Sequence, residues 1–423
     1  MHFSQFILIK KFKIEICIFI LFFLTRYLFL IVSGKDNYEL EIDSYYYNDQ
    51  SNEVLKGNFN LLRHLYIIAP FFSYFQALVK FIFASHWMVV LEFLQISIAS
   101  VSGIYLYKLT NQIFRKNQTA ILAAILFCFY PMTFWWVGTF TQDIWFQSFL
   151  IIFFYYFIKS LHENSLKLLI ISSLIFCLTF LTKSHILLFS IFIPIIILLK
   201  KNIIFTQKLK FIFIFTAISL TSTLPYGIYN LVVNDTYVLS SSGLGGTFIT
   251  GNNNDAYLSH IKRDEITSEQ KARFQYNKYL IMEELKPKIK NKTPKEIQQI
   301  YLSAGLDWVK KNPKKAIELK LDHATRFFTP GISKYWHSFE KWLVVLIITA
   351  PLYFFAYISI FQGIKNNIRE NFWILSLMSS LFIFTTVFYY SGRFMVITLE
   401  PYYIIFASNT LINLKERFLS KNN

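Results

Sequence analysis

A polar stretch lies between two very apolar segments, and its centre reads Glu41-Ile42-Asp43-Ser44-Tyr45-Tyr46-Tyr47-Asn48-Asp49. The whole interruption runs from Gly34 to Arg63. About twenty apolar residues, interrupted only by Arg26, come before it, and that length suffices to cross a bilayer. The acids of this stretch are therefore predicted to lie just past a membrane helix, at the boundary between membrane and water.

The composition indicates a membrane protein with many spans. Of the 423 residues, 54% are hydrophobic and 19% are aromatic, and short basic runs break the apolar segments repeatedly. Such a chain is not an ordinary soluble domain. The formal charge of +17 does not indicate nucleic acid, because the basic residues form clusters between apolar runs rather than a face interleaved with stacking aromatics. The three cysteines lack the spacing of a metal site or a disulfide framework, which favours packing roles.

Windows of about 20 residues predict about ten transmembrane helices. The expected ranges are 13–33, 86–107, 118–137, 144–160, 167–182, 186–200, 209–229, 342–364, 371–390 and 394–414. Lys and Arg test this arrangement, because they collect on cytoplasmic loops. Six basic clusters all fall on one side of it, at residues 10–13, 108–116, 159–167, 200–210, 365–369 and 415–421. Both termini are therefore predicted to lie on the cytoplasmic side of a plasma (inner) membrane.

This arrangement predicts that an opening loop, three short turns and one long region lie on the outer side of the membrane. These segments are residues 34–85, 138–143, 182–185, 391–393 and 230–340. We therefore divide the chain into three parts: an N-terminal membrane module at 1–229 with its first outer loop at 34–85, an extracytoplasmic region at 230–341, and C-terminal membrane helices with a cytoplasmic tail at 342–423.

The long outer region is expected to be mostly helical and to pack on the membrane helices, because roughly 110 residues is small for an independent domain. Thr293-Pro294-Lys295-Glu296 has the pattern of a capping box with proline at the first helical position, so a helix should run to about Lys310. A second, amphipathic helix is expected from Pro313 to about Phe328.

The apolar run from Leu65 to Ser85 would invert every later loop if it crossed the membrane. We interpret it as a pair of interfacial helices with Pro70 near a bend. The predicted fold class is therefore all-α, a polytopic bundle of transmembrane helices with interfacial helices in the first outer loop and a small helical region outside.

Asp43 and Asp49 flank three tyrosines in the first outer loop. A catalytic interpretation makes Asp43 a general base, and Tyr46 and Tyr47 part of a wall that stacks on a sugar and forms hydrogen bonds with it. A solvated loop with interfacial tyrosines explains the same composition. Position alone does not decide between the two.

Three more charged residues are predicted at the outer face. Asp143 stands at the outer start of a helix, where capping and functional roles compete. Lys183 and Arg393 lie at the outer ends of helices, as snorkelling anchors or as cations for a lipid phosphate. Arg26 and Glu92, inside membrane helices, are expected to form a structural ion pair, because unpaired charge at that depth is unfavourable.

The sequence predicts no cofactor and no metal-ligand residues, and it leaves metal dependence open. The eight histidines show no metal-ligand spacing, and the glycine-rich segment 240–251 lacks the Lys-Ser/Thr of a nucleotide loop.

Taken in order, these landmarks resemble the GT-C glycosyltransferases, specifically the family that includes dolichyl-phosphate-mannose protein mannosyltransferases and bacterial lipid A aminoarabinose transferases. Asp43 followed by Tyr47 and Gly57 is similar to the first-loop acid motif of that family. Further similar landmarks are Ala69-Pro70 with Tyr74, Pro131 to Asp143, Leu181-Thr182-Lys183, Pro225 with Asn230, Gly245 to Asn253, and Arg393 to Pro401.

The resemblance implies a membrane enzyme with a sugar donor linked to polyprenyl phosphate. Its acceptor would be a lipid, a glycan or a protein outside the cytoplasm. Asp43 would accept the acceptor's proton during an in-line attack with inversion, Asp143 would orient a substrate, and Lys183 and Arg393 would bind the phosphate. A general acid is not needed, because the leaving phosphate monoester has a second pKa of about 6.

One departure concerns the cations. Some members of that family carry a lysine before the juxtamembrane proline, where this chain has Ala69. Arg63 and His64 are therefore further candidates for binding the donor phosphate.

Two alternatives remain open. A flippase or transporter of lipid-linked sugars would show internal repeats and charged or broken helices near the bilayer midplane, whereas this chain concentrates its acids in outer loops. A structural subunit of a glycosylation complex fits the same helices, but it gives Asp43, Asp143 and Arg393 no reason to converge.

Overall fold

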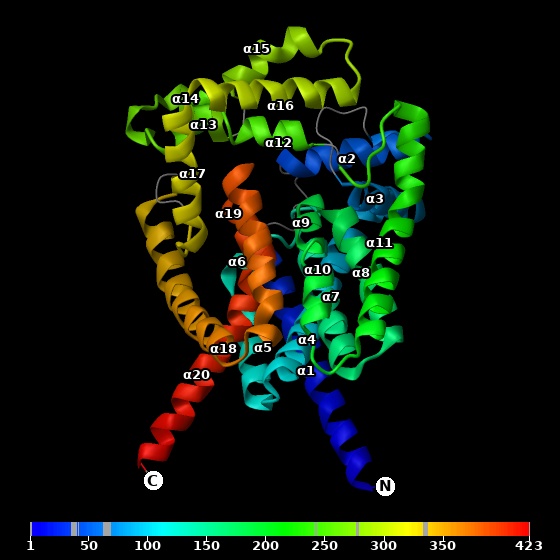
Figure 1. The fold of residues 1–423 in the computed structure, drawn as a ribbon, viewed down its shortest axis with the longest axis vertical. Helices are drawn as coiled ribbons and strands as arrows, with labels where there is room; N and C mark the ends of the chain where they lie inside the picture. The colour runs from blue at the N-terminus through cyan, green and yellow to red at the C-terminus, as the bar shows by residue number, and fades with distance from the viewer. Residues whose placement is uncertain are drawn as a thin grey trace.

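A computed structural model of the chain describes residues 2–34, 40, 42–61, 69–241, 243–275, 279–332 and 337–422. Within these ranges the regular structure is helical and contains no strand, so the predicted all-α class is confirmed. The long helices run roughly side by side, and a layer of shorter helices lies across one end of them (Figure 1).

The helices of the bundle, long and short, overlap the apolar ranges expected from the sequence. They are α1 (His2–Ser33), α4 (Trp87–Phe114), α5 (Asn117–Phe129), α7 (Asp143–Glu163), α8 (Leu166–Thr182), α9 (Leu187–Ser190), α10 (Ile193–Leu199), α11 (Phe205–Asn234), α18 (Phe339–Val387), α19 (Gly392–Thr398) and α20 (Glu400–Asn422). The backbone of Asn367 is non-helical, with φ −158° and ψ 86°, so α18 is two helices that meet at a kink. The kink falls between the predicted ranges 342–364 and 371–390.

Not all of these helices are long enough to span a membrane by length and composition. Among the described residues five qualify, or six if α19 and α20, bent by 58°, count as one span. The segments 117–129, 166–182 and 184–199 are shorter apolar helices. The chain is thus a multi-pass membrane protein, and the number of ten spans stays a prediction.

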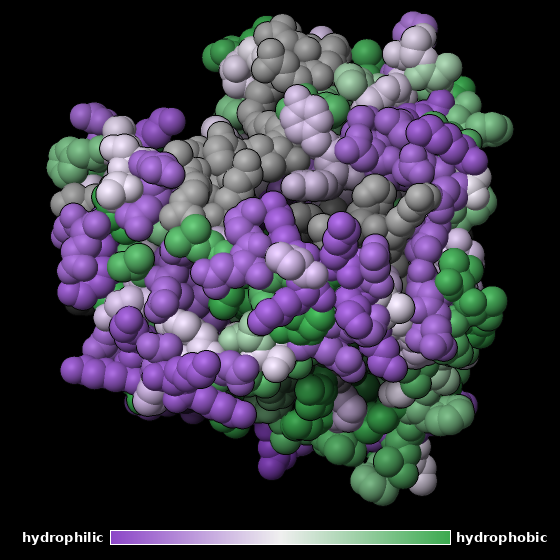
Figure 2. Space-filling view, turned by 90° about the horizontal axis from the view of Figure 1, so that it is seen from above, coloured by the Kyte–Doolittle hydropathy of each residue, from purple (hydrophilic) through white to green (hydrophobic). Residues whose placement is uncertain are grey.

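The layer across one end contains α12 (Leu244–Thr250), α13 (Asn254–His260), α14 (Ser268–Gln275), α15 (Leu280–Ile289) and α16 (Pro294–Lys311), and α17 (Pro313–Phe328) leads back to the bundle. Both termini lie at the opposite end (Figure 1). Seen from the layer's side, the described surface is mostly hydrophilic, with apolar side chains toward one edge (Figure 2). This contrast fits a layer in water above a bundle in lipid.

The local pattern of this layer follows the sequence closely. Thr293 and Glu296 form the predicted capping box: the Glu296 amide donates to Thr293 Oγ1 over 3.3 Å, and the Thr293 amide donates to Glu296 Oε2 over 2.8 Å. The helix ends at Lys311, and α17 begins at Pro313 and ends at Phe328, as the sequence predicts.

The polar stretch 41–49 is largely helical rather than a loop. It contributes most of α2 (Ile42–Leu55), which packs on α3 (Pro70–Phe83). The Tyr47 and Phe72 rings meet edge to face at 5.0 Å between their centroids, and Lys80 Nζ donates to Asn48 Oδ1 over 2.7 Å. Pro70 begins α3, where its missing N–H is harmless in a first turn. Residues 62–68 lie outside the described residues, so the predicted helix pair with a bend near Pro70 stays a prediction.

The expected ion pair between Arg26 and Glu92 is wrong. The Arg26 side chain is buried, and its Nη1 donates to the Cys128 carbonyl over 3.2 Å. Its guanidinium carbon lies 4.2 Å from the centre of the Phe22 ring. A carbonyl dipole and an aromatic face therefore stabilise this charge in place of a carboxylate.

Gly251 connects the outer layer to the C-terminal end of α18. A Cβ added to Gly251 would lie 1.8 Å from the carbonyl oxygen of Phe388, so only glycine allows this approach. Beside it, the buried Asn252 amide donates to the carbonyls of Val387 and Phe388 over 3.3 and 3.4 Å. The outer layer thus fixes the segment that leads directly to Arg393.

Candidate active site

Four charged side chains from four distant elements meet where the outer layer covers the bundle. Asp43 lies in the first turn of α2, Asp143 is the first residue of α7, Lys183 directly follows α8, and Arg393 lies in the first turn of α19. Each is at the end of a helix, so the bundle holds the backbone while the side chain reaches out of it. Their formal charges sum to zero, two carboxylates against two cations.

Arg393 is at the centre of this group. Its Nε donates to Asp143 Oδ1 over 2.6 Å, and its Nη2 donates to Asp143 Oδ2. Its Nη1 donates to Asp43 Oδ2. The guanidinium is therefore bidentate to one carboxylate and joined to a second, a geometry that lysine cannot reproduce. Because both acids contact the same group, they are close enough to border one small sugar site.

Asp143 is completely buried and its two oxygens are engaged. Besides Arg393, Lys183 Nζ lies 3.0 Å from Oδ1, and Thr141 Oγ1 donates to Oδ2 over 2.8 Å. The Lys183 side chain is only 9% exposed. Asp143 therefore holds two cations in place, and its oxygens have little room for a substrate.

Asp43 is the accessible acid. Its side chain is 49% exposed, against 0% for Asp143. Tyr47, one turn further along α2, is buried, and burial raises the pKa of its hydroxyl well above the ordinary value. It is therefore a neutral phenol beside the charged group. Tyr46 is 40% exposed.

Aromatic side chains complete the site, and the sequence did not single out their roles. The Arg393 guanidinium carbon lies 4.7 Å from the centre of the Trp136 ring, and Lys183 Nζ lies 5.5 Å from that of Phe394. Both contacts stabilise a cation. His185 Nε2 and Thr398 Oγ1 are 3.2 Å apart next to these rings. The Trp135-Trp136 pair was a visible signal, but only the fold tells which ring faces Arg393.

Arg63 and His64, the remaining candidates for binding the donor phosphate, lie outside the described residues, so their proximity to the site stays a prediction. Asp49 is exposed on α2, which agrees with a solvated residue. Asp43 and Asp143 each contact a cation, so this group does not present a free set of carboxylates to a metal.

Comparison with known proteins finds a family model that matches part of the chain and solved structures that share its fold. Residues 68–228 match the family model described as dolichyl-phosphate-mannose-protein mannosyltransferase. That range contains Asp143 and Lys183, whereas Asp43 and Arg393 lie outside it. No curated protein sequence matches the chain significantly.

Solved structures share the fold. The chain superposes on the oligosaccharyltransferase of Archaeoglobus fulgidus in the apo form with a TM-score of 0.56 and 14% identity, over 97% of this chain and 52% of that one. The same enzyme tethered to an acceptor peptide with an NVT sequon gives 0.55 and 15%, over 95% and 50%. The chain thus spans about half the length of these structures, and the predicted resemblance to GT-C enzymes is confirmed.

Proposed function

We propose that this chain transfers a sugar from a polyprenyl-phosphate donor to an acceptor hydroxyl or amine on the outer side of the membrane, with inversion. The observation that carries the proposal is the convergence of one half-exposed carboxylate, Asp43, with two cations held by a buried one, Asp143. A base and a phosphate-binding pair are the groups that such a transfer needs.

In the proposed reaction, the acceptor oxygen or nitrogen attacks the anomeric carbon from the side opposite the phosphate. A new bond forms from the acceptor to that carbon, and the bond from the carbon to the phosphate oxygen breaks with its electron pair on the phosphate. Asp43 takes the acceptor's proton. The polyprenyl phosphate leaves as a dianion and needs no proton from the protein, because the second pKa of a phosphate monoester is about 6. This contrasts with glycoside hydrolysis, which requires a second carboxyl group as an acid.

Lys183 and Arg393 are proposed to bind the phosphate as negative charge develops on it. Both cations contact Asp143, which orients them before the donor binds. Such preorganised charges favour electrostatic catalysis. Asp143 is thereby revised from a substrate-binding residue to one that orients these two cations.

The contact between Arg393 and Asp43 gives the two halves of the site a connection. While Asp43 Oδ2 contacts the guanidinium, that oxygen is not available as a base. A donor phosphate that attracts Arg393 would free Asp43 Oδ2 to accept the acceptor's proton. Proton removal would then follow donor binding, which protects the lipid-linked sugar from attack out of order.

Asp43→Asn tests the base. We expect the loss of roughly 10²–10⁴-fold in transfer rate that positioned base catalysis provides, with insertion and melting temperature retained. The measurement is transfer of radiolabelled sugar from a defined polyprenyl phosphate in reconstituted liposomes. Asp49→Asn is the matched control, because it changes an exposed carboxylate of the same helix. Full activity of Asp43→Asn would remove Asp43 from the mechanism.

A further inference from the structure

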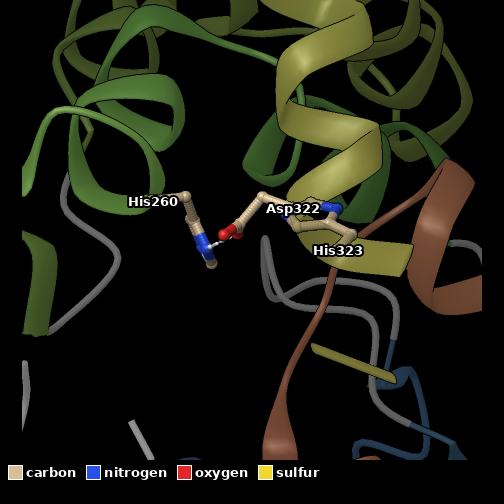
Figure 3. A group of neighbouring side chains, drawn as sticks. All are labelled: His260, Asp322 and His323. Atoms are coloured by element: carbon tan, nitrogen blue, oxygen red, sulfur yellow. Dashed lines mark ion pairs between the residues drawn. The ribbon is translucent and has the colours of Figure 1, made fainter. Parts of the chain in front are cut away.

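A second cluster of polar side chains lies in the outer layer, away from the four charges of the active site. His260 is the last residue of α13, and Asp322 and His323 are neighbours on α17. Figure 3 shows His260 and Asp322 pointing toward each other from the two helices, with the His323 ring beside them; His260 Nδ1 and Asp322 Oδ2 are 3.4 Å apart. One ligand atom from each of the three lies within 4.8 Å of the others.

The imidazole nitrogens of this cluster lack hydrogen bonds although they are largely buried. Within the described residues, His260 Nδ1 and both ring nitrogens of His323 make no hydrogen bond. Asp322 Oδ2, in contrast, forms an ion pair with Arg326. The His323 side chain has no exposure at all. Leaving buried polar atoms unsatisfied is unfavourable, so these nitrogens beside a carboxylate indicate a missing group that binds them.

The chemistry of the cluster selects the kind of group. A neutral imidazole ring offers one nitrogen lone pair, and a carboxylate offers its oxygens. Two imidazoles with one carboxylate suit zinc and neighbouring transition metals, whereas calcium and magnesium prefer oxygen ligands. Ligand atoms around a tetrahedral zinc lie about 3.4 Å apart, given bonds of about 2.0–2.1 Å. Small side-chain movements would therefore close the site.

The charges around Asp322 affect how strongly this cluster would bind a metal ion. Arg326 Nε lies 2.6 Å from its Oδ2, and Arg263 Nη2 lies 3.5 Å from its Oδ1. Hydrogen bonds to a ligating carboxylate are usual around metals and orient it. Two guanidinium groups nevertheless repel a divalent cation, so this site should bind more weakly when both are present.

We propose that His260, Asp322 and His323 form a zinc site that joins α13 to α17, with water as the fourth ligand. The ion would also support the approach to the active site. The His323 and Tyr390 rings are stacked with centroids 6.0 Å apart, and Tyr390 lies three residues before Arg393. The sequence hid this site, because its ligands come from helices about sixty residues apart.

The test uses the full chain in detergent, with any polyhistidine tag removed because it binds the same metals. Zn²⁺ binding is measured by isothermal titration, and the visible absorption of bound Co²⁺ reports whether the coordination is tetrahedral. We expect binding of an equimolar amount of metal, a tetrahedral Co²⁺ spectrum, and a higher melting temperature with Zn²⁺. A wild-type chain that binds neither metal would overturn the proposal without any variant.

Variants locate the ion. His260→Gln and His323→Gln should lose this binding, whereas His337→Gln, an exposed histidine of the same outer region, should keep it. Arg263→Gln should bind about tenfold or more tightly, because it removes a repelling charge next to Asp322. Equal binding in the wild type and in His323→Gln would assign the metal to another place and contradict the proposal.

Discussion

Arg393 Nε donates a 2.6 Å hydrogen bond to Asp143 Oδ1, across 250 positions of sequence. This contact joins the start of α7 to the start of α19, and Lys183 approaches the same oxygen from the end of α8. One buried carboxylate thereby determines where two cations lie. The following consequences can be measured.

Replacing Arg393 should weaken donor binding. Arg393→Ala removes the guanidinium that would form charge-assisted hydrogen bonds with the donor phosphate. Such hydrogen bonds contribute about 1.5–3 kcal/mol, so we expect affinity for a polyprenyl phosphate to fall roughly 10- to 100-fold. Arg393→Lys should rescue little, because an ammonium cannot bind Asp143 through two nitrogens. Equilibrium binding to the solubilised chain gives the numbers. Lys262→Ala, an exposed cation of the outer layer, is the control, and unchanged affinity in Arg393→Ala would place the phosphate elsewhere.

Removing the charge of Asp143 should destabilise the chain as well as inactivate it. Asp143→Asn leaves Lys183 and Arg393 largely buried without their shared carboxylate, which typically destabilises by about 3–5 kcal/mol. Thermal melting of the purified protein measures this. In the double variant with Lys183→Met, part of the melting temperature should return because one uncompensated cation is gone. If Asp143→Asn melts like the wild type, Asp143 does not hold these cations together.

Gly251→Ala should act on the site from a distance. The new Cβ would overlap the Phe388 carbonyl oxygen, so the segment before Arg393 must move. We expect a loss of about 1–3 kcal/mol in stability, typical of overpacking, together with lower transfer activity. Gly246→Ala is a matched control, because the nearest atom to its Cβ would be 3.8 Å away. Equal effects of the two substitutions would rule out this specific contact.

The predicted sidedness can be tested by cysteine labelling of intact cells in a chain whose three cysteines are replaced by alanine. Lys311→Cys, exposed at the end of α16, should react with a reagent that does not cross membranes. Lys415→Cys, exposed on α20, should react only after lysis, because basic clusters stay in the cytoplasm. The reverse pattern would invert the topology.

The limits of helices could be predicted where local chemistry determines them. The capping box at Thr293 and the break at Pro313 depend on neighbours within four residues, and α16 and α17 follow them. The helix α2 could not be predicted in this way, because its residues are polar. It is stabilised by tertiary contacts such as those from Lys80 to Asn48 and Ser51.

In the candidate site, too, local sequence features could be predicted, whereas contacts between distant helices could not. Hydropathy and charge indicated that Asp43, Asp143, Lys183 and Arg393 share one face, which is a property of each residue's own segment. Which acid is buried and which cation it binds depend on the packing of distant helices. The sequence therefore predicted a substrate-binding role for Asp143, while the geometry favours a carboxylate that orients cations. The cluster of His260, Asp322 and His323 could equally not be predicted from spacing, because its members come from two helices that are distant in the sequence.

Arg393 comes much later in the sequence than Asp143 and Lys183, and this order has a consequence for biosynthesis. A ribosome makes roughly 5–20 residues per second and releases earlier helices into the membrane before later ones. Asp143 and Lys183 can pair as soon as α7 and α8 have been inserted. Arg393 can join them only after α19 has been made and has docked. During that interval the buried carboxylate of Asp143 has Lys183 as its cationic partner, and the contact with Arg393 completes the proposed site.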